Sequence, residues 1–272
     1  MYKLIAIDLD GTLLNSQKEI SGKNIKAIQD AMNKGIKVII CSGRIYKGAR
    51  LYARQIGSRE LVIACNGAII RDMATEEALY DNSLSTEDCI NVIDICHQEN
   101  VYFHVYANDI MYTEKLAFGS TFYVKLNEKL KEEDRIDVRL VDNVADVIRD
   151  NSIKASKLIV VSEDGSILSR VREKAESIKS IDVVSSFYDN FEVLNKGVSK
   201  RKALEYVSQR YGIDSSDMIA IGDNENDISM ITYAGLGIAV GNAEDSLKEA
   251  AGYITQATND EDGVAEAINR FI

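Results

Sequence analysis

The 272-residue chain contains no proline and no tryptophan, and it has only two histidines and four cysteines. Without proline, folding is free of slow X-Pro isomerisation, and turns depend on glycine, asparagine, aspartate and serine. The cysteines are too few for a disulfide framework and none forms a C-x-x-C pair, which indicates buried free thiols. Two histidines without acidic neighbours at ligand spacing make no zinc site.

Long apolar runs and an excess of positive charge are also missing. No stretch reaches the roughly 18 apolar residues that a membrane helix needs, and Asp8 and Asp10 interrupt the first apolar run before a signal-peptide core could form. The formal net charge of −11 argues against non-specific binding to nucleic acid or anionic membranes. We therefore expect a cytoplasmic protein with neither nucleic acid nor membrane as a partner.

Apolar strand-like runs alternate with helical periods at both ends of the chain. The predicted strands are residues 4–7, 38–41, 61–64, 218–221 and 236–240. Helical patterns lie between them, and Ser21 and Ser199 are suited to cap two of these helices. This alternation predicts an α/β fold, a Rossmann-like parallel sheet with helices on both faces.

The middle of the chain has a different pattern, in which alternating strands such as Tyr102–Tyr106 mix with helices. We expect an α+β domain at residues 83–189, inserted into a core made of residues 1–82 and 190–272. Phe187–Phe191 should mark the return of the chain to the core.

Two acidic clusters follow predicted strands, at the edge where open α/β sheets bind ligands. Asp8 and Asp10 follow the first strand, and they could share one site or form an ordinary acidic turn. Asp223, Glu225 and Asp227 crowd the end of a later strand. Three carboxylates so close together repel one another unless a cation neutralises them, and Mg²⁺ with oxygen ligands fits best.

Two further clusters are suited to an anion. Ser42-Gly43-Arg44 lies at a strand-to-helix junction, where a hydroxyl and a glycine amide can bind an anion, although most such triplets are turns. Lys200 lies in a first helical turn, where it opposes the helix dipole. A bound anion would compensate for this, although a solvated surface lysine is by far the more common case for such a residue taken alone.

Taken in order, the four clusters resemble the four motifs of the haloacid dehalogenase (HAD) superfamily of phosphohydrolases. They are D-x-D-G-T-L, Ser42-Gly43-Arg44, Lys200 and G-D-x-x-N-D. The long segment between the second and third motifs is similar to the large inserted cap of subclass IIB, and the detail looks like the Cof-type sugar-phosphate phosphatases. The segments Asn66-Gly67-Ala68, Gly197–Lys200 and Gly241-Asn242-Ala243 also match patterns of that subfamily.

The resemblance implies a catalytic role for two residues. Asp8 would be the nucleophile that forms an aspartyl-phosphate, and Asp10 the general acid and then base, with a raised pKa. It also implies that Mg²⁺ is held by Asp8, the Asp10 carbonyl and Asp223. The residues implied in phosphate binding are Leu9, Ser42, Gly43, Lys200 and Asn226, and the supporting residues are Arg44, Thr12 and Asp227.

The expected function is hydrolysis of small phosphorylated metabolites, most of all sugar phosphates, with the inserted domain selecting the substrate. Alternatives are a phosphosugar mutase or phosphotransferase, in which a sugar hydroxyl takes the phosphoryl group, and a receiver-like phosphoacceptor module. Receivers are single small domains, so the insertion favours an enzyme. The sequence leaves the oligomeric state open.

Overall fold

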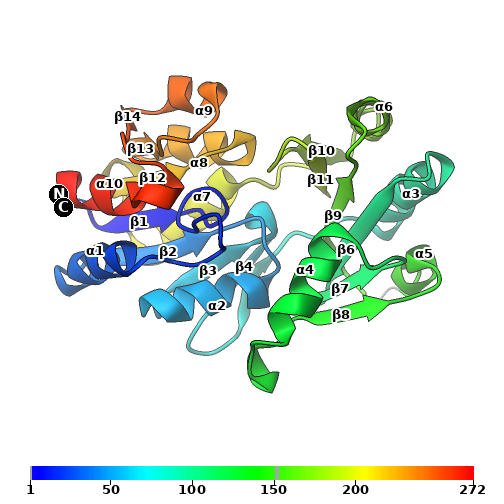
Figure 1. Ribbon diagram of the computed structural model, residues 1–272, viewed down its shortest axis with the longest axis horizontal. Helices are drawn as coiled ribbons and strands as arrows, with labels where there is room; N and C mark the ends of the chain where they lie inside the picture. Colours follow the sequence, from blue (N-terminus) through cyan, green and yellow to red (C-terminus); the bar gives the residue numbers. More distant parts are fainter. Residues whose placement is uncertain (1, 151–152) are drawn as a thin grey trace. The chain divides into compact units, whose positions relative to one another are not determined.

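The computed structural model, which describes residues 2–150 and 153–272, contains two β-sheets, each in a compact unit of its own (Figure 1). The core unit consists of the chain up to Arg44, Ala49–Leu79 and Ser199–Ile272. The inserted unit consists of Tyr80–Val198, with which the short segment Ile45–Gly48 is grouped.

The core unit is built on an eight-stranded sheet. In spatial order its strands are β14 (Tyr253–Ile254), β13 (Leu236–Ala239), β12 (Met218–Gly222), β1 (Leu4–Ile7), β2 (Lys37–Cys41), β3 (Leu61–Ala64), β4 (Ile69–Asp72) and β5 (Ala78–Asp81). The strands from β14 to β3 pair in parallel, and β4 runs antiparallel to β3. The predicted α/β fold with a parallel core is confirmed, whereas β4 and β5 were not expected.

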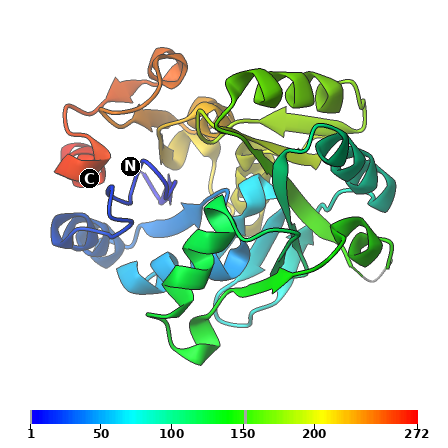
Figure 2. The ribbon, with the colours of Figure 1, turned by 45° about the vertical axis from the view of Figure 1, so that its right-hand side comes forward.

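Helices cover both faces of this sheet. They are α1 (Gly22–Asn33), α2 (Tyr46–Ile56), α7 (Lys200–Tyr211), α8 (Ile228–Tyr233), α9 (Asp245–Ala250) and α10 (Gly263–Phe271). The connections β1–α1–β2 and β12–α8–β13 run in opposite directions along the sheet, so right-handed crossovers place α1 and α8 on opposite faces. α10 packs against α1, as Figure 1 and Figure 2 both show, and α7 packs against α8.

Local sequence explains these elements. β1 and β12 are buried along their whole length, as strands of a parallel sheet covered on both faces must be. The Ser21 hydroxyl caps α1 by accepting from the Asn24 N–H at 3.1 Å, and Ser199 caps α7 in the same way. Gly212, with φ of 63°, ends α7 in a left-handed cap that suits glycine.

The inserted unit is built on a six-stranded, mostly antiparallel sheet. Its strands in spatial order are β10 (Ile181–Val184), β11 (Asn190–Asn195), β9 (Ala155–Val161), β6 (Tyr102–Ala107), β7 (Ile110–Thr113) and β8 (Asp137–Leu140). Its helices are α3 (Thr86–Gln98), α4 (Phe118–Asn127), α5 (Val144–Ile148) and α6 (Gly165–Glu176).

One face of this second sheet forms an apolar core with helices, in which Val105, Val160 and Val193 pack with side chains of α3, α5 and α6. The other face includes His104, which lies against α4 next to Gly119. The unit therefore has its own hydrophobic core, as expected of a domain.

The return of the chain to the core comes later than the sequence analysis placed it. Asn190–Asn195 is β11, which pairs with β9 and β10 and buries Phe191 in the core of the inserted unit. The core unit resumes at Ser199 rather than at residue 190. An apolar strand pattern shows that a strand is buried but not which sheet it joins.

Within the part of the chain that the structure describes, no helix combines the length and the apolar character needed to cross a membrane.

Candidate active site

The candidate site lies where β1 and β12 end, side by side in the middle of the core sheet. Asp8 follows β1 and Asp223 follows β12, and the Asp8 N–H donates to the Ile221 carbonyl oxygen at 3.0 Å. The chain leaves these two strands in opposite directions along the sheet. Such a switch point is where open α/β sheets bind ligands.

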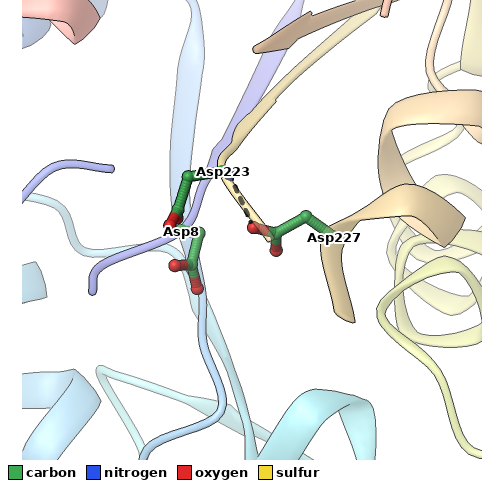
Figure 3. A group of neighbouring side chains, drawn as sticks. All are labelled: Asp8, Asp223 and Asp227. Carbon is green, nitrogen blue, oxygen red and sulfur yellow. Dashed lines mark hydrogen bonds between the residues drawn. The ribbon is translucent and has the colours of Figure 1, made fainter. Parts of the chain in front are cut away.

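Three buried carboxylates meet here, those of Asp8, Asp223 and Asp227, and Figure 3 shows them converging. One oxygen from each lies within 4.8 Å of the others. The Asp227 carboxylate also shapes its own loop, because Oδ2 accepts from the N–H groups of Asp223 at 2.9 Å and Asn224 at 3.3 Å.

Lys200 supplies a positive charge to this group. Its side chain is 0% exposed, and Nζ donates to Asp8 Oδ1 at 2.6 Å and to Asp227 Oδ1 at 2.5 Å. Burial lowers the pKa of Lys200, but the carboxylates of Asp227 and Asp8 outweigh that effect and raise it above its usual range. Lys200 is therefore a charged lysine that bridges two carboxylates, not a solvated surface residue.

The negative charge of the three carboxylates exceeds the positive charge of Lys200. Burial, assisted by Asp227, raises the pKa of Asp8 to about 7 although Lys200 opposes the rise. Burial and the charges of Asp227 and Asp8 raise the pKa of Asp223 well above its usual range. One ammonium faces three carboxylates, so a divalent cation with oxygen ligands would supply the missing positive charge. The residues present fit such an ion.

Gly11 allows the loop after β1 to approach this group. Its φ is 79°, and a Cβ at this position would lie 2.2 Å from Asp223 Oδ2. The neighbouring Thr12 hydroxyl donates to Asp223 Oδ1 at 2.6 Å, and Asn242 Nδ2 donates to the Gly11 carbonyl oxygen at 2.8 Å. The loop is thus fixed to both β12 and the segment after β13.

The segment Ser42-Gly43-Arg44 follows β2, beside β1 in the sheet. The Ser42 hydroxyl accepts from the Arg44 N–H at 3.2 Å, and the Ser42 carbonyl oxygen accepts from the Asn66 N–H at 3.1 Å. Ser42 is buried and Gly43 is half-buried. Leu9 is buried in the loop after β1, where its carbonyl oxygen accepts from the Leu14 N–H at 2.9 Å.

Asp10 turns towards cations rather than towards the carboxylate group. Arg44 binds it through two nitrogens, at 2.6 Å and 2.8 Å, and Lys18 Nζ lies 2.8 Å from Oδ1. Desolvation raises the pKa of Asp10, but Arg44 and Lys18 outweigh it and hold that pKa well below its usual range. The expectation of a raised pKa at Asp10 is therefore wrong, because two cations contact the carboxylate.

Two asparagines, one after β3 and one after β12, complete the site. Asn226 Nδ2 donates to Asn66 Oδ1 at 3.1 Å, while the buried Asn226 Oδ1 has no hydrogen-bond partner in the described residues. Asn66 adopts a left-handed conformation with φ of 57°, and a Cβ on the next residue, Gly67, would lie 2.4 Å from the Ser199 carbonyl oxygen. This close approach seats the loop against the start of α7, and thus next to Lys200.

The structure thus brings Asp8, Asp223, Asp227 and Lys200 into one group, with Thr12 attached to it. Asp10 and Arg44 form a separate pair. Asn66, Asn242 and Lys18 had no role assigned from the sequence. The Asn66-Gly67 dipeptide after β3 could have indicated a tight turn at the site. Nothing in the spacing of Lys18 pointed to a contact with Asp10.

Comparisons with known proteins cover nearly the whole chain. A model of the haloacid dehalogenase-like hydrolase family matches residues 5–268. The 5-amino-6-(5-phospho-D-ribitylamino)uracil phosphatase YcsE of Bacillus subtilis (strain 168) is 35% identical over 271 residues, which are 99% of this chain and 96% of that protein. Phosphatase YwpJ of the same organism is 31% identical over 288 residues, which are 99% of this chain and 100% of that protein.

The fold is shared as well. A haloacid dehalogenase-like hydrolase from Bacteroides thetaiotaomicron superposes with a TM-score of 0.83 at 32% sequence identity, over 100% of both chains.

Proposed function

The chain belongs to the haloacid dehalogenase-like hydrolases as a Cof-type phosphatase, and we propose that it uses Mg²⁺ to hydrolyse small phosphorylated metabolites through an aspartyl-phosphate on Asp8. The observation that carries the proposal is the contact of Asp8, at the end of β1, with the ammonium of Lys200 at 2.6 Å, beside Asp223 and Asp227. A nucleophile for a phosphoryl group needs this combination of a buried carboxylate and nearby positive charge.

In the first step, an Asp8 oxygen attacks phosphorus, the Asp8–phosphorus bond forms, and the bond from phosphorus to the alcohol oxygen breaks. Lys200 holds Asp8 Oδ1 in place and offsets the charge of the transferring group. The leaving alcohol takes a proton from Asp10. Asp10 must carry that proton when the step begins, although Arg44 and Lys18 favour its ionised form.

In the second step, water attacks the phosphoryl group on Asp8. Asp10, ionised as its cationic partners hold it, accepts the proton of this water. The products are inorganic phosphate and free Asp8. Asp10 can take this role because it gave its own proton to the leaving alcohol in the first step.

Magnesium would be held by carboxylate oxygens of Asp8 and Asp223 together with the Asp10 carbonyl, with water and a phosphate oxygen completing its shell. When bound, it neutralises the negative charge of the carboxylates and of the phosphoryl group. Asp227 is a poorer ligand, because Lys200 occupies one of its oxygens and two backbone N–H groups the other. We assign Asp227 to orienting Lys200 and the loop after β12.

The remaining phosphate oxygens have donors at neighbouring strand ends. We assign the Ser42 hydroxyl, the Asn226 amide and Lys200 to this role, together with the backbone N–H groups of Leu9 and Gly43. Donors fixed by the fold stabilise developing charge without reorganising during the reaction.

These donors bind only the phosphate, so other residues must recognise the leaving group. We assign that recognition to the inserted unit. One relative is named for a substrate with a phosphorylated ribityl chain. A sugar phosphate or sugar-alcohol phosphate is therefore the class of substrate that we propose here.

The test is phosphate release from a panel of phosphorylated sugars, sugar alcohols and nucleotides with Mg²⁺ present. We expect the wild type to hydrolyse one class preferentially, and Asp8→Asn to abolish release, since the amide cannot attack phosphorus. Asp94→Asn, a change in α3 of the inserted unit, is the matched control and should retain activity. Turnover by pure Asp8→Asn protein would exclude Asp8 as the nucleophile.

A further inference from the structure

The Asp10 carboxylate belongs to a closed ring of contacts that includes two residues outside the four motifs, Lys18 and Tyr52. Arg44 donates from Nε to Asp10 Oδ2 at 2.6 Å and from Nη2 to Oδ1 at 2.8 Å. Lys18 Nζ donates to the same Oδ1 at 2.8 Å. The Tyr52 hydroxyl accepts from Arg44 Nη1 at 3.4 Å and donates to the Lys18 carbonyl oxygen at 3.1 Å, which closes the ring.

The loop that carries Lys18 holds its backbone in an unusual conformation. The φ of Lys18 is 62°, in the left-handed region that non-glycine residues rarely adopt. The Lys18 N–H donates to the Asn15 carbonyl oxygen at 2.8 Å, and Asn15 Oδ1 accepts from the N–H groups of Gln17 and Glu19 at 3.0 Å and 2.9 Å. These bonds fix the point from which the lysine side chain reaches Asp10.

Stability does not explain the Lys18 contact. The side chains of Lys18 and Asp10 are 42% and 40% exposed, and an ion pair with that exposure adds little to the stability of a fold. Strained backbone conformations cluster at active sites and ligand clamps, and the one at Lys18 lies beside Asp10. The contact therefore favours a role in what Asp10 does.

The ring also determines which oxygen of Asp10 can exchange a proton. A carboxylate has about four lone-pair sites. Among the described contacts, Oδ1 accepts two hydrogen bonds and Oδ2 accepts one. Oδ2 is thus the oxygen with room for a further partner.

We propose that Lys18 and Tyr52 are positioning residues, which act through Arg44 and Asp10 to present Asp10 Oδ2 for proton transfer. This inference rests on the proposed function, in which Asp10 exchanges a proton with the leaving alcohol and the attacking water. Lys18 contributes a direct bond to the carboxylate. Tyr52 contributes by tying the Arg44 guanidinium, which lies 4.9 Å from its ring centre, to the Lys18 backbone.

The test is a pair of kinetic comparisons on the best alkyl phosphate of the substrate panel. Lys18→Met should lower kcat by roughly tenfold at unchanged KM, because a carboxylate held by Arg44 alone is less well placed for proton transfer. Lys18→Arg, which keeps a donor, should restore most of the loss. The matched control is Lys26→Met, which removes another exposed lysine–aspartate pair of the core unit, with Asp30 at 2.6 Å, and should leave kcat unchanged.

The decisive comparison repeats Lys18→Met in an Asp10→Asn background, where it should have no further effect on kcat. Tyr52→Phe keeps the ring but lacks the hydroxyl, and it should give a smaller loss of kcat. This loss should also disappear in the Asp10→Asn background. Tyr52→Phe replaces Lys18→Met in the test if the latter does not fold. An unchanged kcat, a change confined to KM, or the same fractional loss without Asp10 would each overturn the inference. If Asp8→Asn retains activity, the proposed function itself fails, whatever Lys18 does.

Discussion

The two units bury charged side chains in opposite ways. In the inserted unit, Lys157 on β9 and Glu192 on β11 are both buried, and Lys157 Nζ lies 2.9 Å from Glu192 Oε2. One positive charge is balanced by one negative charge in the middle of two strands. Ser186 donates to the other oxygen of Glu192 at 2.7 Å, so the carboxylate is satisfied on both sides.

The core unit gathers its buried charges at strand ends and leaves them unbalanced. Lys200 faces Asp8 and Asp227, and Asp223 lies beside them, so one ammonium meets three carboxylates. A balanced pair needs no further partner, whereas a group with excess negative charge is stabilised when a cation binds beside it. The difference separates a structural ion pair from a site prepared for ligands.

The largest effect should come from removing the cation. In a chelator, we expect phosphate release to fall to background and to return with Mg²⁺. Calcium should inhibit, because its looser shell of six to eight ligands misplaces the nucleophile. Full activity in the chelator would contradict the scheme.

The same experiment can locate the cation. Mg²⁺ should raise the melting temperature of the wild type, since a ligand that binds only the folded state stabilises it. Asp223→Asn should lose this shift, and Glu192→Gln, which alters the balanced pair, should keep it. If the shift in melting temperature survived in Asp223→Asn but not in Glu192→Gln, the Mg²⁺ site would lie in the inserted unit and not in the core unit.

A smaller but still large effect is expected at Asp10. Asp10→Asn should slow turnover by about 10²–10⁴-fold on alkyl phosphates, because an amide cannot exchange the proton. The loss should be less for aryl phosphates, whose leaving groups need little protonation. The measurement is kcat/KM for both ester types, and an equal loss for the two would count against Asp10 as the acid.

The balanced pair should affect stability. Lys157→Met alone leaves Glu192 buried without its partner, and we expect the free energy of unfolding to fall by about 3–5 kcal/mol. Replacing both residues by methionine should recover most of the loss, since an apolar pair has no charge to desolvate. Urea denaturation measures both free energies of unfolding. A double variant as unstable as the single one would show that the two side chains stabilise the unit by more than the cancelling of their charges.

The convergence of Asp8, Asp223 and Lys200 could be expected from the sequence. Residues that follow parallel strands meet at one edge of the sheet, so strand patterns and spacing sufficed to place the first two together. Lys200 was added to this group only by the resemblance to the HAD motifs, because the residue pattern alone left a solvated surface lysine open. The expectation for the two aspartates held because it depends on backbone periodicity, which the sequence expresses directly.

Other features depend on tertiary contacts that leave no periodic signal. The left-handed turn at Lys18 brings a loop lysine onto Asp10, where it assists Arg44 in lowering a pKa that was expected to be raised. The strand Asn190–Asn195 has the same apolar pattern in either sheet, so its membership in the inserted unit was not evident. Both features depend on contacts between segments that are distant in the sequence or lie in irregular loops.

The placement of Asp8 and Lys200 on either side of the insertion affects how the molecule is assembled. Asp8 and Lys200 are 192 residues apart, and β1 has its neighbour β12 still further along the chain. During synthesis the ribosome delivers Asp8 early, but neither its ammonium partner nor β12 emerges until Tyr80–Val198 has been made. The continuous middle segment can fold first, because domains fold as units and its contacts need no later residue. The central sheet, and with it the group of Asp8, Lys200 and Asp223, can close only after the inserted unit has been made.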